Sequence, residues 1–418
     1  MDVATFSAAA LMLTASYSMY AQDISTPTPL SELIAEAEKN NAQILAAEHT
    51  WRAATHMAQQ VTTLPDPQLT VQQFSVGSPR PFAGFTNSDF AYIGFGASQT
   101  LPYPGKLRLK GRVAEREADT EHAQADALRA SVAEQVKTTY FHLAYLQQTL
   151  TFLEHSGTTL KQLADSELSR YRVGQGSQAD VLKAQLEHTK LVREITMHHE
   201  EMAQVEADLK LLLHRSQESP NIVADNLKAT RLDYGAPELL SLVRDDNPAV
   251  HVQTVALKKQ DAQLQSAERG SKPDFSVGYM FEETGEHYRD YYMLTLNVSL
   301  PRRRRVYAEV AEAVELRSRA KQDLDAQLQK QLSEVQKQYI AASTAAELLT
   351  EYREGLIPQA EAAFRAGLTA YQSNAQELNS VLLSFNDLLS LKRDSEQALL
   401  DHEMAIAHLE TLTGAALQ

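Results

Sequence analysis

A proline-free stretch from Leu107 to Tyr171 sets the strongest limit on what this chain can fold into. The stretch is rich in Ala, Glu, Gln, Leu and Arg, and a second long segment with a similar composition runs from Arg303 to about Leu368. The first predicts a single helix of roughly 100 Å at 1.5 Å per residue. A three-four spacing of leucines within it predicts coiled-coil packing: Leu143, Leu146, Leu150, Leu153 and Leu160. Helices of this length cannot be buried in one globular domain, so the molecule must be elongated.

The two long helices belong to a sequence that repeats itself. "YRVGQGSQADVLKAQ" from Tyr171 returns as "YQSNAQELNSVLLSF" from Tyr371, and "LPYPGK" from Leu101 is echoed by "LPRRRR" from Leu300. Upstream, two further pairs of segments match in the same order: "LPDPQLTVQQF" with "SKPDFSVGYMF", and "SELIAEAEKNNAQI" with "PELLSLVRDDNPAV". We therefore expect two structural repeats, residues 22–220 and 221–418, each built as helix, strand, strand, very long helix, turn and helix.

The opening helix of each repeat is bounded by turn signals. In the first repeat we expect a helix from Leu30, capped by Ser31, to Val61, where "LPDP" stops it because proline cannot continue a helix. In the second repeat the same pattern predicts a helix from Pro237 to Gly270.

Four segments alternate with period two and predict β-strands. They lie near residues 67–76, 90–101, 274–283 and 291–300, and nearly half of the Phe and Tyr residues gather around them. A strand of about ten residues crosses a bilayer when it is tilted, and aromatic residues form girdles at the two interfaces of an outer-membrane barrel. The core of a soluble sheet could use the same residues, so the strands alone leave both interpretations open.

The first residues resemble a secretory signal. An apolar run from Val3 to Ala15 precedes small residues, which predicts a signal peptide over residues 1–21. The usual basic residue before the apolar run is missing and Asp2 stands there instead, so a buried or disordered N-terminus is the alternative.

Composition excludes several classes of function. The chain has no cysteine, which rules out disulfides, thiolate metal sites and a cysteine nucleophile. Its formal net charge of −15 is the opposite of what nucleic-acid binding favours, so "RRRR" from Arg302 is interpreted as an anchor at a membrane interface.

Four membrane strands cannot close a barrel by themselves. An open sheet in lipid leaves two edges of unpaired N–H and C=O groups, each costing several kcal/mol. Two copies would give about eight strands around an interior filled by side chains, whereas three would give about twelve strands around a channel. The chain is therefore expected to form an oligomer.

These motifs resemble the TolC family of outer-membrane efflux proteins. The resemblance rests on the order of "LPDP", "LPYPGK" and "YRVGQGSQADVL", and extends over nearly the whole chain from Leu30. It implies a mixed α/β membrane protein, a homotrimer whose four strands per chain build a twelve-stranded β-barrel in the outer membrane of a Gram-negative bacterium. Below the barrel, a long α-helical barrel would cross the periplasm.

The resemblance also implies a function and partners. Such a protein is a passive exit duct that docks on a periplasmic adaptor and an inner-membrane transporter of the resistance-nodulation-division (RND) class. The "PGK" form of the corner at Gly105 is most similar to members that export heavy-metal cations. A duct for drugs or a secreted polypeptide is the alternative, and a soluble, elongated coiled-coil scaffold is the alternative from a different class.

Site residues follow from the family pattern. The helical hairpin tips would form the gate and the adaptor-docking surface, although every helical hairpin needs such turns. The docking candidates are Tyr171, Gly174, Gly176, Ser177, Tyr371 and Asn374, and the gate candidates are Asp180, Ser380, Leu383 and Asp387. Ser380, Leu383 and Gln376 depart from the charged pattern of some members. Asp387 lies two turns beyond Ser380 on one helical face and could form a carboxylate ring, or could simply be exposed to solvent.

The corner and the histidines complete the sequence analysis. Pro102, Pro104 and Gly105 are expected to end a strand and turn the chain into the long helix, with Pro301 in the equivalent place. Neighbouring His198 and His199 point about 100° apart on a helix, so no metal site is expected. The sequence contains no phosphate-binding loop and no catalytic constellation, so we expect no enzymatic activity and no cofactor.

Overall fold

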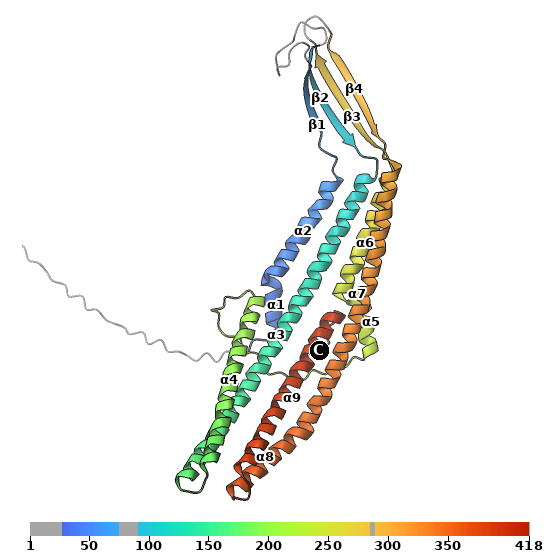
Figure 1. Ribbon diagram of the computed structural model, residues 1–418. Coiled ribbons are helices and arrows are strands. Elements are labelled where there is room, and N and C mark those ends of the chain that lie inside the picture. The colour runs from blue at the N-terminus through green and yellow to red at the C-terminus, as the bar shows by residue number, and fades with distance from the viewer. Residues whose placement is uncertain (1–26, 75–90, 285–288, 418) are drawn as a thin grey trace, which may run out of the picture.

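The computed structural model describes residues 27–74, 91–284 and 289–417, and the signal peptide predicted over residues 1–21 lies outside them. The molecule is elongated, with a small β-sheet at one end, long helices running away from it, and two helical hairpins at the other end (Figure 1). This is the architecture that the two very long helical patterns require.

Both halves of the chain have the same order of elements. The first half contains α1 (Leu30–Asn40), α2 (Ala42–Thr62), β1 (Gln68–Phe74), β2 (Tyr92–Leu101), α3 (Lys106–Arg172) and α4 (Gln178–Leu212). The second half contains α5 (Ala236–Asp246), α6 (Pro248–Arg269), β3 (Asp274–Glu283), β4 (Tyr291–Ser299), α7 (Arg303–Glu351), a π-helical segment η1 (Tyr352–Leu356), α8 (Ile357–Gln372) and α9 (Leu378–Thr413). The proposed boundary between repeats at residue 220 falls between α4 and α5 and stays a prediction.

The four strands form one antiparallel sheet in the order β1-β2-β3-β4. Along it, Val71 lies opposite Phe95, Phe95 opposite Phe281, and Phe281 opposite Tyr292. The prediction of four strands per chain is confirmed, and β1 and β4 are the open edges of the sheet.

The opening helices are broken where the sequence analysis expected continuous ones. α1 ends at Asn40, and the side chain of Asn41 accepts hydrogen bonds from the N–H groups of Gln43 at 2.9 Å and Ile44 at 3.3 Å, which caps a new helix. The cap expected at Ser31 is wrong, because Ser31 lies inside α1 and Pro29 precedes that helix without a side-chain cap. Asn247 repeats the break in the second half, where it accepts from Val250 N–H at 2.8 Å.

The same two asparagines also tie the helices together. The Nδ2 of Asn41 donates to the Leu212 carbonyl at the end of α4 (2.9 Å), and the Nδ2 of Asn247 donates to the Leu412 carbonyl near the end of α9 (2.7 Å). Both asparagines are buried. Each break is therefore a defined joint, and the two halves build it from matching residues.

α3 is continuous over 67 residues, whereas the second long helix contains the π-helical turn η1. Pro358 follows this turn, and proline lacks an N–H and clashes with the carbonyl four residues before it. Leu101 and Tyr171 are 70 positions apart, while Leu300 and Tyr371 are 71 apart. The second helix must accommodate one additional residue over the same span, and a π turn does so.

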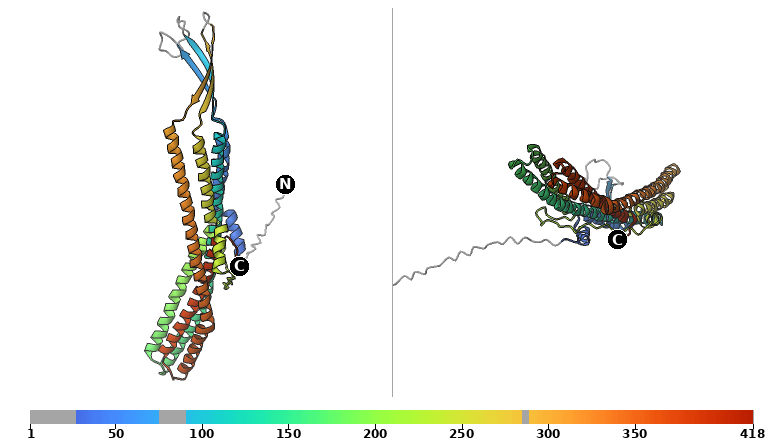
Figure 2. Two further views of the ribbon diagram at one scale, coloured as in Figure 1. Left: turned by 90° about the vertical axis from the view of Figure 1, so that its right-hand side faces the viewer. Right: turned by 90° about the horizontal axis from the view of Figure 1, so that it is seen from below.

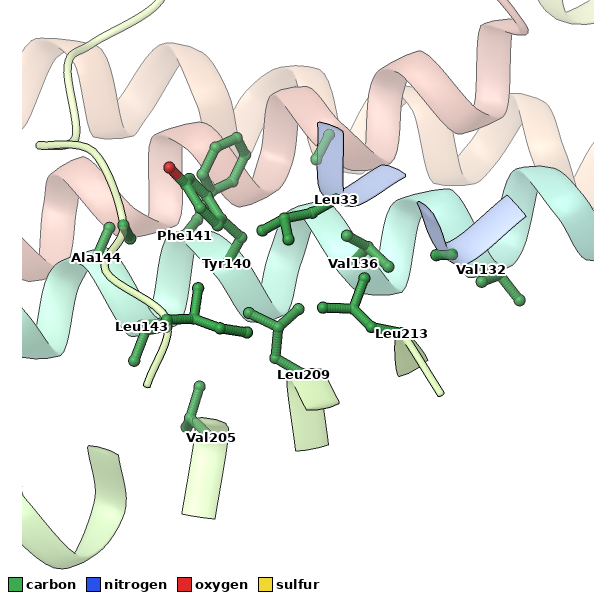
Figure 3. Packing of buried hydrophobic residues seen from close by; sticks show 14 of the residues in the cluster. Leu33, Val132, Val136, Tyr140, Phe141, Leu143, Ala144, Val205, Leu209 and Leu213 are labelled. Atoms are coloured by element: carbon green, nitrogen blue, oxygen red, sulfur yellow. The ribbon is translucent and has the colours of Figure 1, made fainter. Parts of the chain in front are cut away.

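The helices form a curved layer rather than a closed bundle (Figure 2). α3 packs against α2, α4, α6 and α9, and α7 packs against α6 and α9. Apolar clusters are spread along this layer. In the cluster of Figure 3, Leu33 of α1, Val136 and Tyr140 of α3 and Leu209 of α4 point toward one another. Within the described ranges, no helix combines the length and apolarity that crossing a membrane would require.

Candidate functional site

The two faces of the sheet differ sharply in polarity. Strand alternation places one apolar row outward, and these side chains are largely exposed: Leu69 is 83% exposed and Leu294 77%, with Val71, Phe95 and Leu296 also exposed. The opposite face carries small and polar residues, for example Gln72, Gly94, Ser98, Gly278 and Thr295. A soluble sheet buries its apolar face, whereas a barrel wall in lipid exposes it and turns its polar face to the lumen.

The strand-to-helix corner is held by residues from both halves of the chain. Gly105 has a φ of +91°, a conformation that favours glycine, and it is the N-cap of α3. Asp274, at the start of β3, accepts a hydrogen bond from the Tyr103 N–H (2.9 Å) and pairs with the Lys106 ammonium (2.9 Å). The Arg269 side chain donates to the Pro104 carbonyl at 2.8 Å. The structure thus places Pro102, Pro104 and Gly105 at the predicted corner.

The second corner has a simpler build. Pro301 follows the Leu300 that ends the strand segment, and α7 begins within two residues, with Arg302 as its N-cap. No glycine with a positive φ is present at this corner. Pro301 lies at this corner, whereas the sequence analysis did not consider Asp274 and Arg269, which hold the first corner. The recurrence of Pro-Asp at the start of β3 and just before β1 is the signal that could have indicated Asp274.

The first hairpin tip is a tight turn with a capped return helix. Gly174 has a φ of +78°, and its N–H donates to the Tyr171 carbonyl at 2.9 Å. Ser177 is the N-cap of α4, because its Oγ accepts the Asp180 N–H at 3.0 Å. The same Oγ donates to the Asp180 carboxylate at 2.7 Å. A Cβ at Gly176 would lie 3.2 Å from the backbone nitrogen of Tyr171, which explains the small residue there.

The second tip makes its turn without glycine and contacts the first tip. Asn374 takes the place of Gly174 with a φ of +57°, and its side-chain oxygen accepts from Arg170 at 2.5 Å. The Arg170 guanidinium also lies 4.8 Å from the centre of the Tyr371 ring. Burial and a hydrogen bond to Glu167 raise the pKa of the Tyr371 hydroxyl. This link between tips was not predicted from the sequence.

One cleft between the tips collects most of the predicted tip residues. Its lining includes Gly174, Gly176, Ser177, Asp180, Tyr371 and Asn374. Tyr171 is exposed outside this cleft, and Ser380, Leu383 and Asp387 lie further along α9. Leu383 and Asp387 are exposed and Ser380 is half-buried. The gate role of these residues stays a prediction.

The histidines are distributed singly. His199 lies 3.6 Å from Glu154, and His402 is buried with its two ring nitrogens 2.9 and 2.8 Å from the carbonyl oxygens of Ala342 and Thr230. In the described part of the chain, no three His, Cys, Asp or Glu side chains gather closely enough to hold a metal ion.

Comparison with known proteins gives a consistent result. The family model for outer membrane efflux proteins matches residues 33–213, which correspond to the first repeat. By sequence, no curated protein matches the chain.

Solved structures share the fold over almost the full length. The CusC channel aligns with a TM-score of 0.78 at 16% identity, covering 93% of both chains. VceC, an outer membrane protein from Vibrio cholerae, aligns with a TM-score of 0.77 at 16% identity, covering 93% of this chain and 97% of that one. The Campylobacter jejuni CmeC outer membrane channel aligns with a TM-score of 0.79 at 15% identity, covering 93% and 86%. At such identities the likeness establishes the fold.

A sheet with an exposed apolar face, set on helices that lead away from it, has the build of one segment of a barrel wall that faces lipid. Residues 33–213 match the family model for outer membrane efflux proteins, and 93% of the chain shares the fold of solved outer-membrane channel proteins such as CusC and VceC. The resemblance stated from the sequence is confirmed.

Proposed function

We propose that three copies of this chain assemble into the exit duct of a tripartite efflux pump that exports heavy-metal cations. The duct itself is passive, and a partner transporter of the RND class in the inner membrane supplies the energy. A periplasmic adaptor would join the two by docking at the hairpin tips near Gly174 and Asn374.

The observation that carries this proposal is the exposed apolar face of a sheet whose two edges are open. Leu69, Val71, Leu294 and Leu296 cover the outer strands β1 and β4 with side chains that only lipid would bury. Each edge strand also presents N–H and C=O groups that have no water to bind inside a membrane. Closing the edges with further copies removes this cost, and three copies give about twelve strands around an open lumen.

The size of the assembly can be measured directly. The protein extracted in mild detergent is expected to have the mass of a trimer plus its detergent by light scattering, and to aggregate when the detergent is removed. A stable monomer in plain buffer would support the soluble scaffold instead and would overturn the duct.

The cargo rests on two sequence features. The formal net charge is −15, and an acidic lining raises the local concentration of cations without selecting one of them. The Pro-Gly-Lys corner at Lys106 is of the form that resembles the cation-exporting branch. The similar solved structures do not decide the cargo, because at 15–16% identity they establish the fold alone.

Growth of a deletion strain tests the cargo. The strain, and the same strain carrying the gene on a plasmid, would be grown across copper, silver, zinc, cobalt and cadmium, and across dyes and detergents. We expect sensitivity to metals that the plasmid reverses. Sensitivity confined to dyes and detergents would overturn the metal assignment and leave an efflux duct with a different cargo.

A further inference from the structure

The first corner of the molecule shows how a strand end is locked to its neighbour. β2 ends beside the start of β3. There the carboxylate of Asp274 accepts hydrogen bonds from the Tyr103 N–H and from the Lys106 ammonium, both at 2.9 Å. The Lys106 side chain is only 14% exposed and also donates to the Lys272 carbonyl at 2.7 Å. The contact therefore joins the first half of the chain to the second at the base of the sheet.

The chain contains a second set of residues that matches those of this corner. Pro65-Asp66 precedes β1 as Pro273-Asp274 begins β3, and Leu300-Pro301 ends β4 as Leu101-Pro102 ends β2. The hairpins support this matching of residues: Gln68 pairs with Ser98 in the first, and the matched residues Ser276 and Asn297 pair in the second. By this matching, Arg302 stands where Tyr103 does and Arg305 where Lys106 does.

Within one chain, the matched residues Asp66 and Arg305 cannot contact each other. Asp66 precedes β1 and Arg305 follows β4, and these strands are the opposite edges of the sheet. Asp66 is exposed, and among the described residues it has no hydrogen-bond or ion-pair partner. Arg302, Arg303 and Arg304 likewise have no ion-pair partner in the described part of the chain, and Arg305, whose side chain is 67% exposed, reaches only Glu309 at 3.5 Å.

In the proposed trimer, the open edge β4 of one copy lies beside the open edge β1 of the next. We propose that Asp66 of that next copy binds the Arg302 N–H and the Arg305 guanidinium, and that this contact sets the register between the two strands. This inference rests on the proposed trimer and specifies how its interfaces close. The charges are complementary, because a lone exposed carboxylate meets a run of four arginines at the first turn of a helix, where a negative charge is favoured.

The matching also fixes the register of the interface. In the chain, Thr100 pairs with Ser276, Gln99 with Val277 and Ala97 with Tyr279. Transferred to the interface, this places Ser299 opposite Gln68, Val298 opposite Leu69 and Leu296 opposite Val71 of the next copy. All four of these apolar residues are exposed on the outward face of the sheet, so the register continues one apolar surface across the junction. A slip by one residue would set apolar side chains against the polar face.

Disulfide trapping tests the register in a chain that contains no cysteine of its own. Gln68→Cys combined with Ser299→Cys places two thiols directly opposite across the interface, within the Cα separation of about 4.4–6.8 Å that a disulfide needs. Oxidation is expected to give a covalent trimer on a non-reducing gel. The control, Gln68→Cys with Asn297→Cys, is two residues out of register and is expected to give little.

The mass of the unoxidised double variant in detergent separates the two hypotheses. A trimer that does not crosslink, or that crosslinks as well in the control, would overturn this register and leave the proposed duct standing. A monomer would overturn the proposed function itself.

The ion pair between Asp66 and Arg305 is tested by measuring the temperature at which the trimer dissociates in SDS. Asp66→Asn and Asp66→Lys are expected to lower this temperature by several degrees, and Asp66→Lys with Arg305→Glu is expected to recover most of it. Asp208→Asn, an exposed carboxylate on α4, is the matched control. An unchanged dissociation temperature for Asp66→Asn, or no recovery in the reversed pair, would mean that the arginines serve another ligand such as lipid phosphate.

Discussion

At the scale of single residues, the two buried asparagines show how a side chain can define a helical joint. Asn41 caps α2 through its oxygen and holds the end of α4 through its nitrogen, and Asn247 repeats both contacts in the second half. An amide is required for this, because only an amide offers an acceptor and donors on one short side chain. A carboxylate of the same shape could cap the helix but could not donate to the Leu212 carbonyl.

Asn41→Ala is expected to destabilise the protein by about 1–3 kcal/mol, since it removes a helix cap and leaves the partly buried Leu212 carbonyl without its donor. The thermal midpoint of the detergent-solubilised protein measures the change. Asn40→Ala is the matched control, because Asn40 is the exposed neighbouring amide. Equal midpoints for the two variants would contradict the role given to Asn41.

His408 makes part of the stability depend on pH. A hydrogen bond to Glu134 is the main cause that raises the pKa of His408, and the nearby Glu334 carboxylate acts in the same direction. Because the folded pKa lies above the unfolded value, the stabilisation is complete below about pH 6.5 and is lost as the pH rises through the folded pKa.

His408→Gln should therefore lower the thermal midpoint at pH 5.5 more than at pH 8.5. The side chain of His408 is 36% exposed, so solvent screening limits the effect to about 1 kcal/mol or less. His49→Gln, an exposed histidine on α2, is the control. A loss of the same size at both pH values would show that packing, and not charge, is what His408 provides.

At the scale of elements, the sequence predicts what local patterns encode. The strands follow from alternation and α3 from its composition, and the tip cap at Ser177 follows from its place before a helix. Contacts between elements that are distant in the sequence could not be predicted from local patterns. Nothing near Arg170 indicates that its guanidinium covers Tyr371, and nothing local to Asp274 indicates that it holds Tyr103. Asn41 and Asn247 occupy matching positions in the two repeats of the sequence, but the apolar periodicity alone favoured unbroken helices.

The turn between α3 and α4 gives an element-scale prediction for docking. Gly174→Pro is expected to abolish crosslinking to the adaptor, because proline fixes φ near −65° where the chain needs +78° and removes the N–H that donates to Tyr171. Gly174→Asn is the matched control, since Asn374 adopts the same left-handed conformation in the other tip. Normal crosslinking by Gly174→Pro would show that the adaptor does not depend on this turn.

At the scale of the whole molecule, the hairpin tips are the predicted gate of the proposed trimer. Asp180 lies in the cleft between the two tips and acts electrostatically on Tyr371 of the second one. Its carboxylate accepts a hydrogen bond from the Ser177 hydroxyl, so Asp180 carries both a contact within its own turn and a negative charge at the predicted gate.

Asp180→Ala is expected to raise the single-channel conductance of the trimer in planar bilayers, because the tip loses both the hydrogen bond between the Ser177 hydroxyl and this carboxylate and its negative charge. Asp208→Ala, far from the tips on an exposed face of α4, should conduct as the wild type does. Unchanged conductance in Asp180→Ala would remove this residue from the gate and shift attention to Asp387.

The π turn before Pro358 changes the phase of the second long helix. At the corner, the matched residues Leu101 and Leu300 are 199 positions apart. At the tip, the matched residues Tyr171 and Tyr371 are 200 positions apart, so the offset between the repeats grows by one residue along the helix. One residue corresponds to a rotation of about 100° in an α-helix. The face that α7 turns toward its neighbours therefore continues in α8 on sequence positions that an unbroken heptad count would place about 100° away around the helix.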